Sequence, residues 1–267
     1  MESTQTQFKL DDGAQTTIER WGSSGPVVLC VHGMVSSRRS WVRFAERFGD
    51  RYQIVAYDQR GHGDSAATTG PMSLAQGVRD LRSVAAHVSA RLLVGHSWGG
   101  TVVVRGGRDM NVDGVIAIDP MIVQVDDDWY AEYIEELDET FALTGAARDA
   151  RTREDFDQWH PDDVEGKVHA VHTMTSAPIA GLRDDNRDGT WDLRGDIASY
   201  DKPLLLVMAG KDGSIVPSEV IDEVVGRHSS NVRIVTFEEQ GHNLHRTDFE
   251  AFAAASRAFI NDVLQEA

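Results

Sequence analysis

A serine framed by small residues carries the strongest chemical signal in the chain. The stretch 95–99 has the sequence G-H-S-W-G and centres on Ser97, with an apolar strand-like run at 92–94 before it and an apolar helix-like run at 102–104 after it. In a G-x-S-x-G pattern between strand and helix, the glycines allow a turn too tight for neighbouring Cβ atoms, and the turn lifts the serine hydroxyl clear of the sheet. The pattern therefore predicts a nucleophilic serine.

A serine hydroxyl is a weak nucleophile at neutral pH, so a general base must take its proton. The chain has ten histidines. His242 comes just after the last strand-like run, 232–237, and we predict that it is the base. His245, three residues further along, is the alternative. His32 and His96 lie inside tight glycine turns, where a role in loop geometry is expected.

The histidine must in turn be held in one tautomer by a carboxylate. Asp212 lies in a glycine-framed loop after the run 204–208, and a carboxylate in that loop can reach a histidine placed after the next strand. Asp119, at the end of the run 115–118, is the alternative acid, although it also fits a simple cap of a strand end. We favour Asp212, which gives the chain order serine, acid, histidine.

Cleavage of an acyl bond also needs hydrogen-bond donors for the oxyanion that develops. Trp98 offers its backbone N–H at the start of the helix that follows the serine. Met34 is placed to offer a second backbone N–H from the loop after Val31-His32-Gly33. We predict these two groups as the oxyanion hole.

Short apolar runs alternate with segments of helical periodicity along the first half of the chain. The segments 41–48 and 78–88 have apolar residues at helical spacing, and two shorter runs, 8–10 and 17–21, fit a leading antiparallel hairpin. This alternation predicts an α/β fold with a mostly parallel central sheet and helices on both faces. The expected buried strands are 27–31, 53–57, 92–94, 115–118, 204–208 and 232–237.

The alternation stops between residues 121 and 200, where we find helical segments and no convincing strand. We therefore predict a core domain formed by 1–120 and 201–267, with 121–200 inserted as a helical cap, or lid. Seven aromatic residues of the cap can wall an apolar pocket, although we expect about five of them to anchor cap helices to the core. They are Trp129, Tyr130, Tyr133, Phe141, Phe156, Trp159 and Trp191.

The composition excludes several classes of function. The 267 residues carry a formal net charge of −17, which argues against binding to nucleic acid or to an anionic lipid surface. The single cysteine, Cys30, excludes an intrachain disulfide and a thiolate metal cluster. We find neither a signal peptide nor an apolar run long enough to span a membrane, so we expect a cytoplasmic protein.

The acidity is concentrated in the predicted cap. Residues 121–200 hold 20 of the 43 acidic residues and seven of the 26 basic ones, which is −13 of the total −17. Solvated helix faces explain such a charge most simply. A sharper hypothesis is that a negative lid disfavours anionic substrates and leaves neutral or cationic ones.

From about Phe8 to its C-terminus, the chain resembles an α/β-hydrolase with a helical cap. Four motifs occur in the order typical of that family: H-G-M at 32–34, D-Q-R-G-H-G-D-S at 58–65, the serine turn, and the acid with His242. In such proteins the second motif is structural. Serine at the turn excludes the branch with an aspartate nucleophile, the dehalogenases and epoxide hydrolases. The loop H-G-M-V-S also differs from the H-G-G-P-G of prolyl aminopeptidases.

The resemblance implies a serine hydrolase of the carboxylesterase type that needs neither a metal nor an organic cofactor. We expect it to cleave esters or lactones of small to medium neutral substrates through an acyl-enzyme. A C–C bond hydrolase of the meta-cleavage-product type keeps the same triad and is the alternative, and the scaffold also supports a perhydrolase side activity. A non-catalytic small-molecule receptor is the alternative from another class. The oligomeric state, monomer or homodimer, stays open.

Overall fold

A computed structural model of the chain describes residues 1–68, 70–172, 174–187 and 191–264. It contains one eight-stranded sheet in the order β1-β2-β4-β3-β5-β6-β7-β8. The first two strands form an antiparallel hairpin, β2 pairs antiparallel with β4, and the remaining neighbours are parallel. The strands are β1 (Ser3–Lys9), β2 (Gln15–Trp21), β3 (Val27–Val31), β4 (Gln53–Tyr57), β5 (Ala90–His96), β6 (Gly114–Ile118), β7 (Leu204–Ala209) and β8 (Val232–Phe237).

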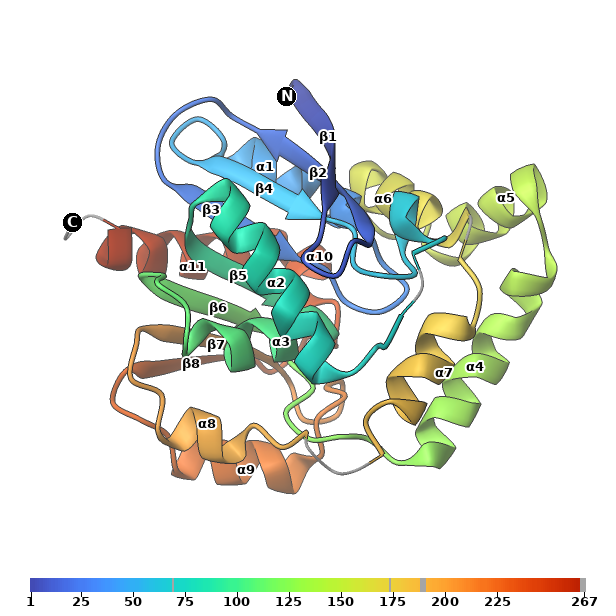
Figure 1. Cartoon of the computed structure of the whole chain (residues 1–267). Helices are drawn as coiled ribbons and strands as arrows, with labels where there is room; N and C mark the ends of the chain where they lie inside the picture. The colour runs from blue at the N-terminus through green and yellow to red at the C-terminus, as the bar shows by residue number, and fades with distance from the viewer. Residues whose placement is uncertain (69, 173, 188–190, 265–267) are drawn as a thin grey trace.

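Helices cover both faces of this sheet (Figure 1), as the alternation of the sequence predicted. One apolar core lies between the sheet and α2 (Leu74–Val88), α3 (Trp98–Gly107), α8 (Arg194–Ala198) and α9 (Ser218–Gly226). The other lies under α1 (Val42–Phe48) and α11 (Phe249–Leu264). The middle strands β3, β6 and β7 are buried along their whole length, which explains their uninterrupted apolar sequences. Cys30 is buried in β3.

The motif at 58–65, which directly follows β4, forms a buried network of charged and polar groups. Asp58 accepts hydrogen bonds from the backbone N–H of Arg38 at 2.8 Å and from the backbone N–H of Asp64 at 2.9 Å, and it also pairs with the Arg38 guanidinium. Gly63 has a φ of +50°, and a Cβ atom there would lie 2.5 Å from the Asp58 carboxylate. The motif therefore fixes the loops around η1 (Arg38–Trp41) and η2 (Gly63–Ser65), which is a structural role.

Among the described residues, five helices lie between β6 and β7 in the chain, over the range where the sequence predicted an inserted cap. They are α4 (Asp127–Ala142), α5 (Gly145–Asp155), α6 (Pro161–His172), α7 (Ala177–Asp184) and α8. The first four lie to one side of the sheet (Figure 1), with α4 against α7 and α6 against η1 and α1. The limits 121 and 200 stay a prediction, because α8 packs on α3 and α9 of the core, and Tyr200 Oη donates to the Val104 carbonyl at 3.2 Å.

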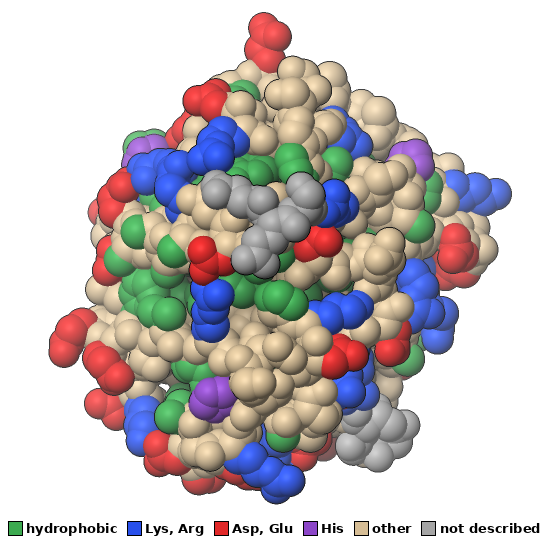
Figure 2. Space-filling view, turned by 90° about the vertical axis from the view of Figure 1, so that its left-hand side faces the viewer, with side chains coloured by type: hydrophobic (Ala, Val, Ile, Leu, Met, Phe, Trp, Pro, Cys, Tyr) green, Lys and Arg blue, Asp and Glu red, His purple; other side chains and the backbone are tan. Residues whose placement is uncertain are grey.

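Charge is unevenly distributed over the surface. Figure 2 shows the face turned away from α4 and α5, where Lys, Arg, Asp and Glu side chains are interspersed. Helix α4, in contrast, starts with three consecutive aspartates at 126–128 and carries an acidic outer face. Helices α10 (Leu244–Thr247) and α11 complete the fold. No helix in the described ranges is long and apolar enough to cross a membrane.

Arg148 of α5 ties the helices between β6 and β7 together. Its guanidinium is buried and donates to backbone carbonyls at the ends of α4 and α6, at distances of 2.7–3.3 Å. A planar group with five donors suits such a cluster of unpaired helix-end carbonyls. The acceptors are the carbonyls of Phe141, Leu143, Val171, His172 and Met174.

We expect Arg148→Met to lower the free energy of unfolding by about 2–4 kcal/mol, because several buried carbonyls lose their partners at once. Arg151→Met is the matched control, since Arg151 is on the same helix but pairs with Asp155 at the surface. We expect this variant to unfold at nearly the wild-type urea concentration, because solvent screens an exposed ion pair. Urea unfolding followed by circular dichroism measures both. Equal stability of the two variants would contradict the role assigned to Arg148.

Candidate active site

Ser97 occupies a strained turn between β5 and α3. Its φ of 54° and ψ of −124° lie in a region that residues with a Cβ rarely adopt. The turn can form only because glycines stand two residues before and two residues after Ser97. A Cβ on Gly95 would lie 2.3 Å from the Gly99 carbonyl oxygen, and a Cβ on Gly99 would lie 2.3 Å from the Val31 carbonyl oxygen. The Ser97 backbone N–H donates to the Ile118 carbonyl at 2.9 Å. The predicted nucleophile thus has the backbone geometry that the motif requires.

His242 pairs with Asp119. Its Nδ1 lies 2.7 Å from Asp119 Oδ2, and Asp119 is fully buried where β6 ends. The other carboxylate oxygen, Oδ1, accepts from the Ala209 backbone N–H at 3.1 Å and from Ser214 Oγ at 2.8 Å. A carboxylate held on both oxygens keeps the imidazole in one orientation, with a proton on Nδ1 and a free lone pair on Nε2.

The prediction that Asp212 orients the histidine is wrong. Asp212 is exposed on the turn after β7, and this turn contacts His242 only through the backbone, where the Gly213 carbonyl accepts from the His242 N–H at 2.9 Å. The reason lies in strand register. Ile118 of β6 pairs with Val207 of β7, so Asp119 follows its strand directly at the sheet edge, whereas Asp212 comes after a turn that leads outward.

The other histidines near the site pack or form hydrogen bonds that hold its loops in place. His245, the alternative base, is buried, does not line the cavity, and packs its ring 4.1 Å from the ring of His96. His96 Nε2 lies 2.9 Å from the His242 carbonyl oxygen. His32 binds the Gly33 carbonyl through Nδ1 at 2.7 Å and accepts the Gln59 N–H through Nε2 at 3.0 Å. Burial lowers the pKa of His32 to about 4, so it stays neutral and fixes the loop, as predicted.

The loop that holds Met34 lies directly beside the serine, because a Cβ on Gly33 would be 2.9 Å from Ser97 Cβ. In the part of the chain that the structure describes, the backbone N–H groups of Met34 and Trp98 donate to no backbone carbonyl. Trp98 is also the first residue of α3, where the helix dipole favours negative charge. Both N–H groups are therefore free of backbone partners, and their assignment to an oxyanion hole stays a prediction.

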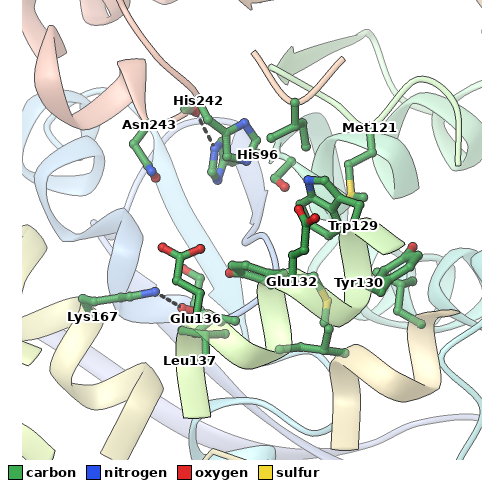
Figure 3. Close-up of a pocket in the computed structure, with 18 of the residues that line it drawn as sticks. His96, Met121, Trp129, Tyr130, Glu132, Glu136, Leu137, Lys167, His242 and Asn243 are labelled. Carbon is green, nitrogen blue, oxygen red and sulfur yellow. Dashed lines mark hydrogen bonds between the residues drawn. The ribbon is translucent and has the colours of Figure 1, made fainter. Parts of the chain in front are cut away.

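A cavity of about 400 Å³ connects these groups. Ser97, His242 and Met34 line it together with residues of α4, α6 and α7. Figure 3 shows His242 and Asn243 opposite Glu136 and Leu137 of α4. Within the described residues, Ser97 Oγ and His242 Nε2 do not form a hydrogen bond; in unliganded sites such contacts often tighten only when substrate binds. Five of the seven aromatic residues line the cavity: Trp129, Tyr130, Tyr133, Phe156 and Trp159. Lining does not exclude anchoring, since Tyr130 is also fully buried in the core.

Two cations that the sequence analysis did not single out also line the cavity. Lys167 of α6 and Arg246 of α10 are each more than nine-tenths buried. Burial lowers the pKa of Lys167 to about 7 and that of Arg246 to about 10. Arg246 lies four residues after His242, but no motif in the sequence marks Lys167 or Arg246 as part of the site. Among the described residues, no group of three or more His, Cys, Asp or Glu is arranged to hold a metal ion.

The known proteins that resemble this chain share one fold, but their names describe different reactions. Residues 28–255 match the sequence profile of the alpha/beta hydrolase family. The chain is 24% identical to N-formylmaleamate deformylase of Pseudomonas putida over 260 residues, 92% of each protein. It is 25% identical to a non-heme haloperoxidase of Rhodococcus erythropolis, over 93% of this chain and 97% of that protein. The crystal structure of E-2-(acetamidomethylene)succinate hydrolase superposes with a TM-score of 0.81 at 19% identity, covering 97% and 100% of the two chains.

Whether Asp119 or Asp212 orients His242 can be tested with isosteric variants of the two carboxylates. We expect Asp119→Asn to lower kcat/KM for p-nitrophenyl acetate by about 10³–10⁴-fold, because the amide favours the wrong imidazole tautomer. Asp212→Asn is the matched control and should stay within about twofold of wild type, since an exposed turn residue changes little. The opposite pattern, with Asp212→Asn the inactive variant, would restore the original assignment.

Proposed function

Because the chain belongs to the alpha/beta hydrolase family, we propose that it is a serine hydrolase that cleaves carboxylic esters or lactones through an acyl-enzyme. The observation that carries the proposal is the pairing of His242 with the buried carboxylate of Asp119 at 2.7 Å, at the edge of the same cavity that exposes Ser97. A nucleophile, a base and a group that orients the base are thereby brought together.

In the proposed first step, Ser97 Oγ attacks the acyl carbon while His242 Nε2 takes the hydroxyl proton. The negative charge moves to the carbonyl oxygen, where the N–H groups of Met34 and Trp98 stabilise it. His242 then gives its proton to the departing alkoxide, which leaves as an alcohol. In the second step His242 activates water, water attacks the acyl-enzyme, and Ser97 is regenerated with release of the carboxylic acid. The Asp119 carboxylate orients His242 and stabilises the imidazolium that forms.

The cavity limits the size of the substrate. A volume of about 400 Å³ is at the lower end of the range for small-molecule sites, which supports small to medium substrates. The aromatic side chains on α4 favour an apolar portion of the substrate. The buried Lys167 and Arg246, however, speak against the hypothesis that substrates are neutral, because the charge that a ligand meets in a cavity is set by the nearest groups and not by the net charge of the protein.

Amide cleavage is the second candidate. It is supported by the similarity to N-formylmaleamate deformylase over 92% of both chains, a protein whose name describes removal of a formyl group. The same residues serve this reaction, with the difference that His242 must protonate a nitrogen as it leaves. Cleavage of a C–C bond has no comparable support.

Ser97 can be tested as the nucleophile with a fluorophosphonate probe. We expect wild type to be labelled at Ser97, Ser97→Ala to be unlabelled, and Asp212→Asn to be labelled at the wild-type rate. Intact-protein and peptide mass spectrometry locate the adduct. Equal labelling of wild type and Ser97→Ala would show that the chain is not a serine hydrolase and would favour the non-catalytic receptor.

The bond type can be tested with a panel of aryl esters of increasing acyl length, small lactones and N-acyl amides. We expect kcat/KM to be highest for short and medium acyl groups and to fall once the acyl chain exceeds the cavity. Hydrolysis of amides but not of esters of the same acid would favour the second candidate. Background rates across the whole panel, together with labelling of Ser97, would favour C–C bond cleavage.

A further inference from the structure

Two buried cations lie on the cavity wall next to the oxyanion loop. Lys167 Nζ donates to the Val35 carbonyl at 2.8 Å, and an Nη atom of Arg246 donates to Ser36 Oγ at 3.3 Å. Val35 and Ser36 directly follow Met34. The ammonium and the guanidinium are therefore anchored to adjacent residues of one loop, a short distance along the chain from the N–H group that would face the scissile carbonyl.

Neither cation has a carboxylate partner in the part of the chain that the structure describes. Asp163, whose charge acts on Arg246, is itself bound to Arg43 at 2.6 Å. The Nε atom of Arg246 is buried and donates to no acceptor within the described residues. A buried cation without an anion is costly, because it has lost its hydration and gained no ion pair. For Lys167 this cost lowers the pKa to about 7, so that near neutral pH only part of the molecules carry the charge until an anion binds beside it. Such an arrangement is expected where a ligand brings the missing negative charge.

The acidic groups of α4 do not fill this role. Glu132 and Glu136 of α4 line the cavity but are exposed to solvent, so their carboxylates remain hydrated. The charge of Glu136 does act on Lys167, and Figure 3 shows the two side chains on the same side of the cavity. Glu136 is thus placed as a competitor of an incoming anion for Lys167, at the mouth of the site.

Resting on the proposed function, we propose that Lys167 and Arg246 bind a free carboxylate of the substrate, so that the enzyme prefers half-esters, or the corresponding half-amides, of short dicarboxylic acids. A guanidinium and an ammonium that converge on one carboxylate form the strong, charge-assisted class of hydrogen bond. The free carboxylate must lie within a few bonds of the scissile carbonyl, because both cations are anchored to the loop that carries Met34.

The substrate test compares charged and neutral esters of the same acids. The probes are the monoethyl and diethyl esters of malonic, succinic and glutaric acid, with release of ethanol as the readout. We expect at least one monoethyl ester to have a kcat/KM at least about tenfold above that of its diethyl ester, as charge-assisted hydrogen bonds to a carboxylate imply. A preference for the diethyl ester in all three pairs, or equal rates, would overturn the proposal.

Three variants of cavity residues and one control test whether the preference for the monoethyl ester arises in the cavity. Arg246→Gln and Lys167→Met are each expected to lower the ratio of the two kcat/KM values by about tenfold. Glu136→Gln is expected to raise this ratio, because it removes the competing carboxylate. Arg227→Gln is the control for net charge, since Arg227 is exposed at the end of α9, and it should leave the ratio unchanged. A ratio that changes equally in Arg227→Gln and Arg246→Gln would point to long-range charge and contradict a local site.

A binding measurement separates this proposal from the proposed function. In Ser97→Ala, titration with succinate or glutarate is followed by isothermal titration calorimetry and by the intrinsic tryptophan fluorescence, to which Trp129 and Trp159 on the cavity wall contribute. The neutral diamides serve as control ligands. Saturable binding of a diacid that Arg246→Gln abolishes supports the subsite even if no ester is cleaved. Cleavage of diethyl esters with no binding of either diacid leaves the serine hydrolase in place and shows that the subsite is wrong.

Discussion

The backbone of Ser97 is the constraint on which the rest of the site depends. A non-glycine residue at φ 54° and ψ −124° is expected to cost about 1–3 kcal/mol, so the surrounding structure must hold it there. The Ser97 N–H is bound to the end of β6, and Val102–Val104 of α3 are completely buried against the sheet. Because the turn leaves no space for a Cβ at Gly95 or Gly99, packing is the reason that the motif requires glycine at these two positions.

A parallel sheet then determines where the partners of the serine can come from. The carboxyl ends of neighbouring parallel strands meet at one edge, so β3, β5, β6 and β8 deliver their next loops to the same place. Met34 follows β3, Asp119 follows β6, and His242 follows β8. The helices between β6 and β7 leave the sheet at this edge as well, which is why α4, α6 and α7 close the cavity over the serine.

The sequence was sufficient for features that depend on neighbouring residues, and insufficient for features that depend on strand order. The apolar runs predicted the sheet, and local motifs predicted the turn of Ser97 and the loop of His32. The acid was misassigned because Asp119 and Asp212 both follow buried strands, and only the register of β6 against β7 shows which one faces His242. Lys167 and Arg246 belong to no local motif. They meet only because α6 and α10, far apart in the chain, pack around the loop after Met34.

The charge of residues 121–200 is a second case in which the sequence was insufficient. Residues 121–200 carry −13, and from composition alone this predicts repulsion of anions. Most of that charge lies on exposed helix faces, where water and salt screen it over roughly 8–10 Å. The cations inside the cavity are few, but they are buried, poorly screened, and within contact distance of a bound ligand. An anionic substrate would therefore be slowed on approach by the surface and retained by the interior, and the interior decides which substrate is bound.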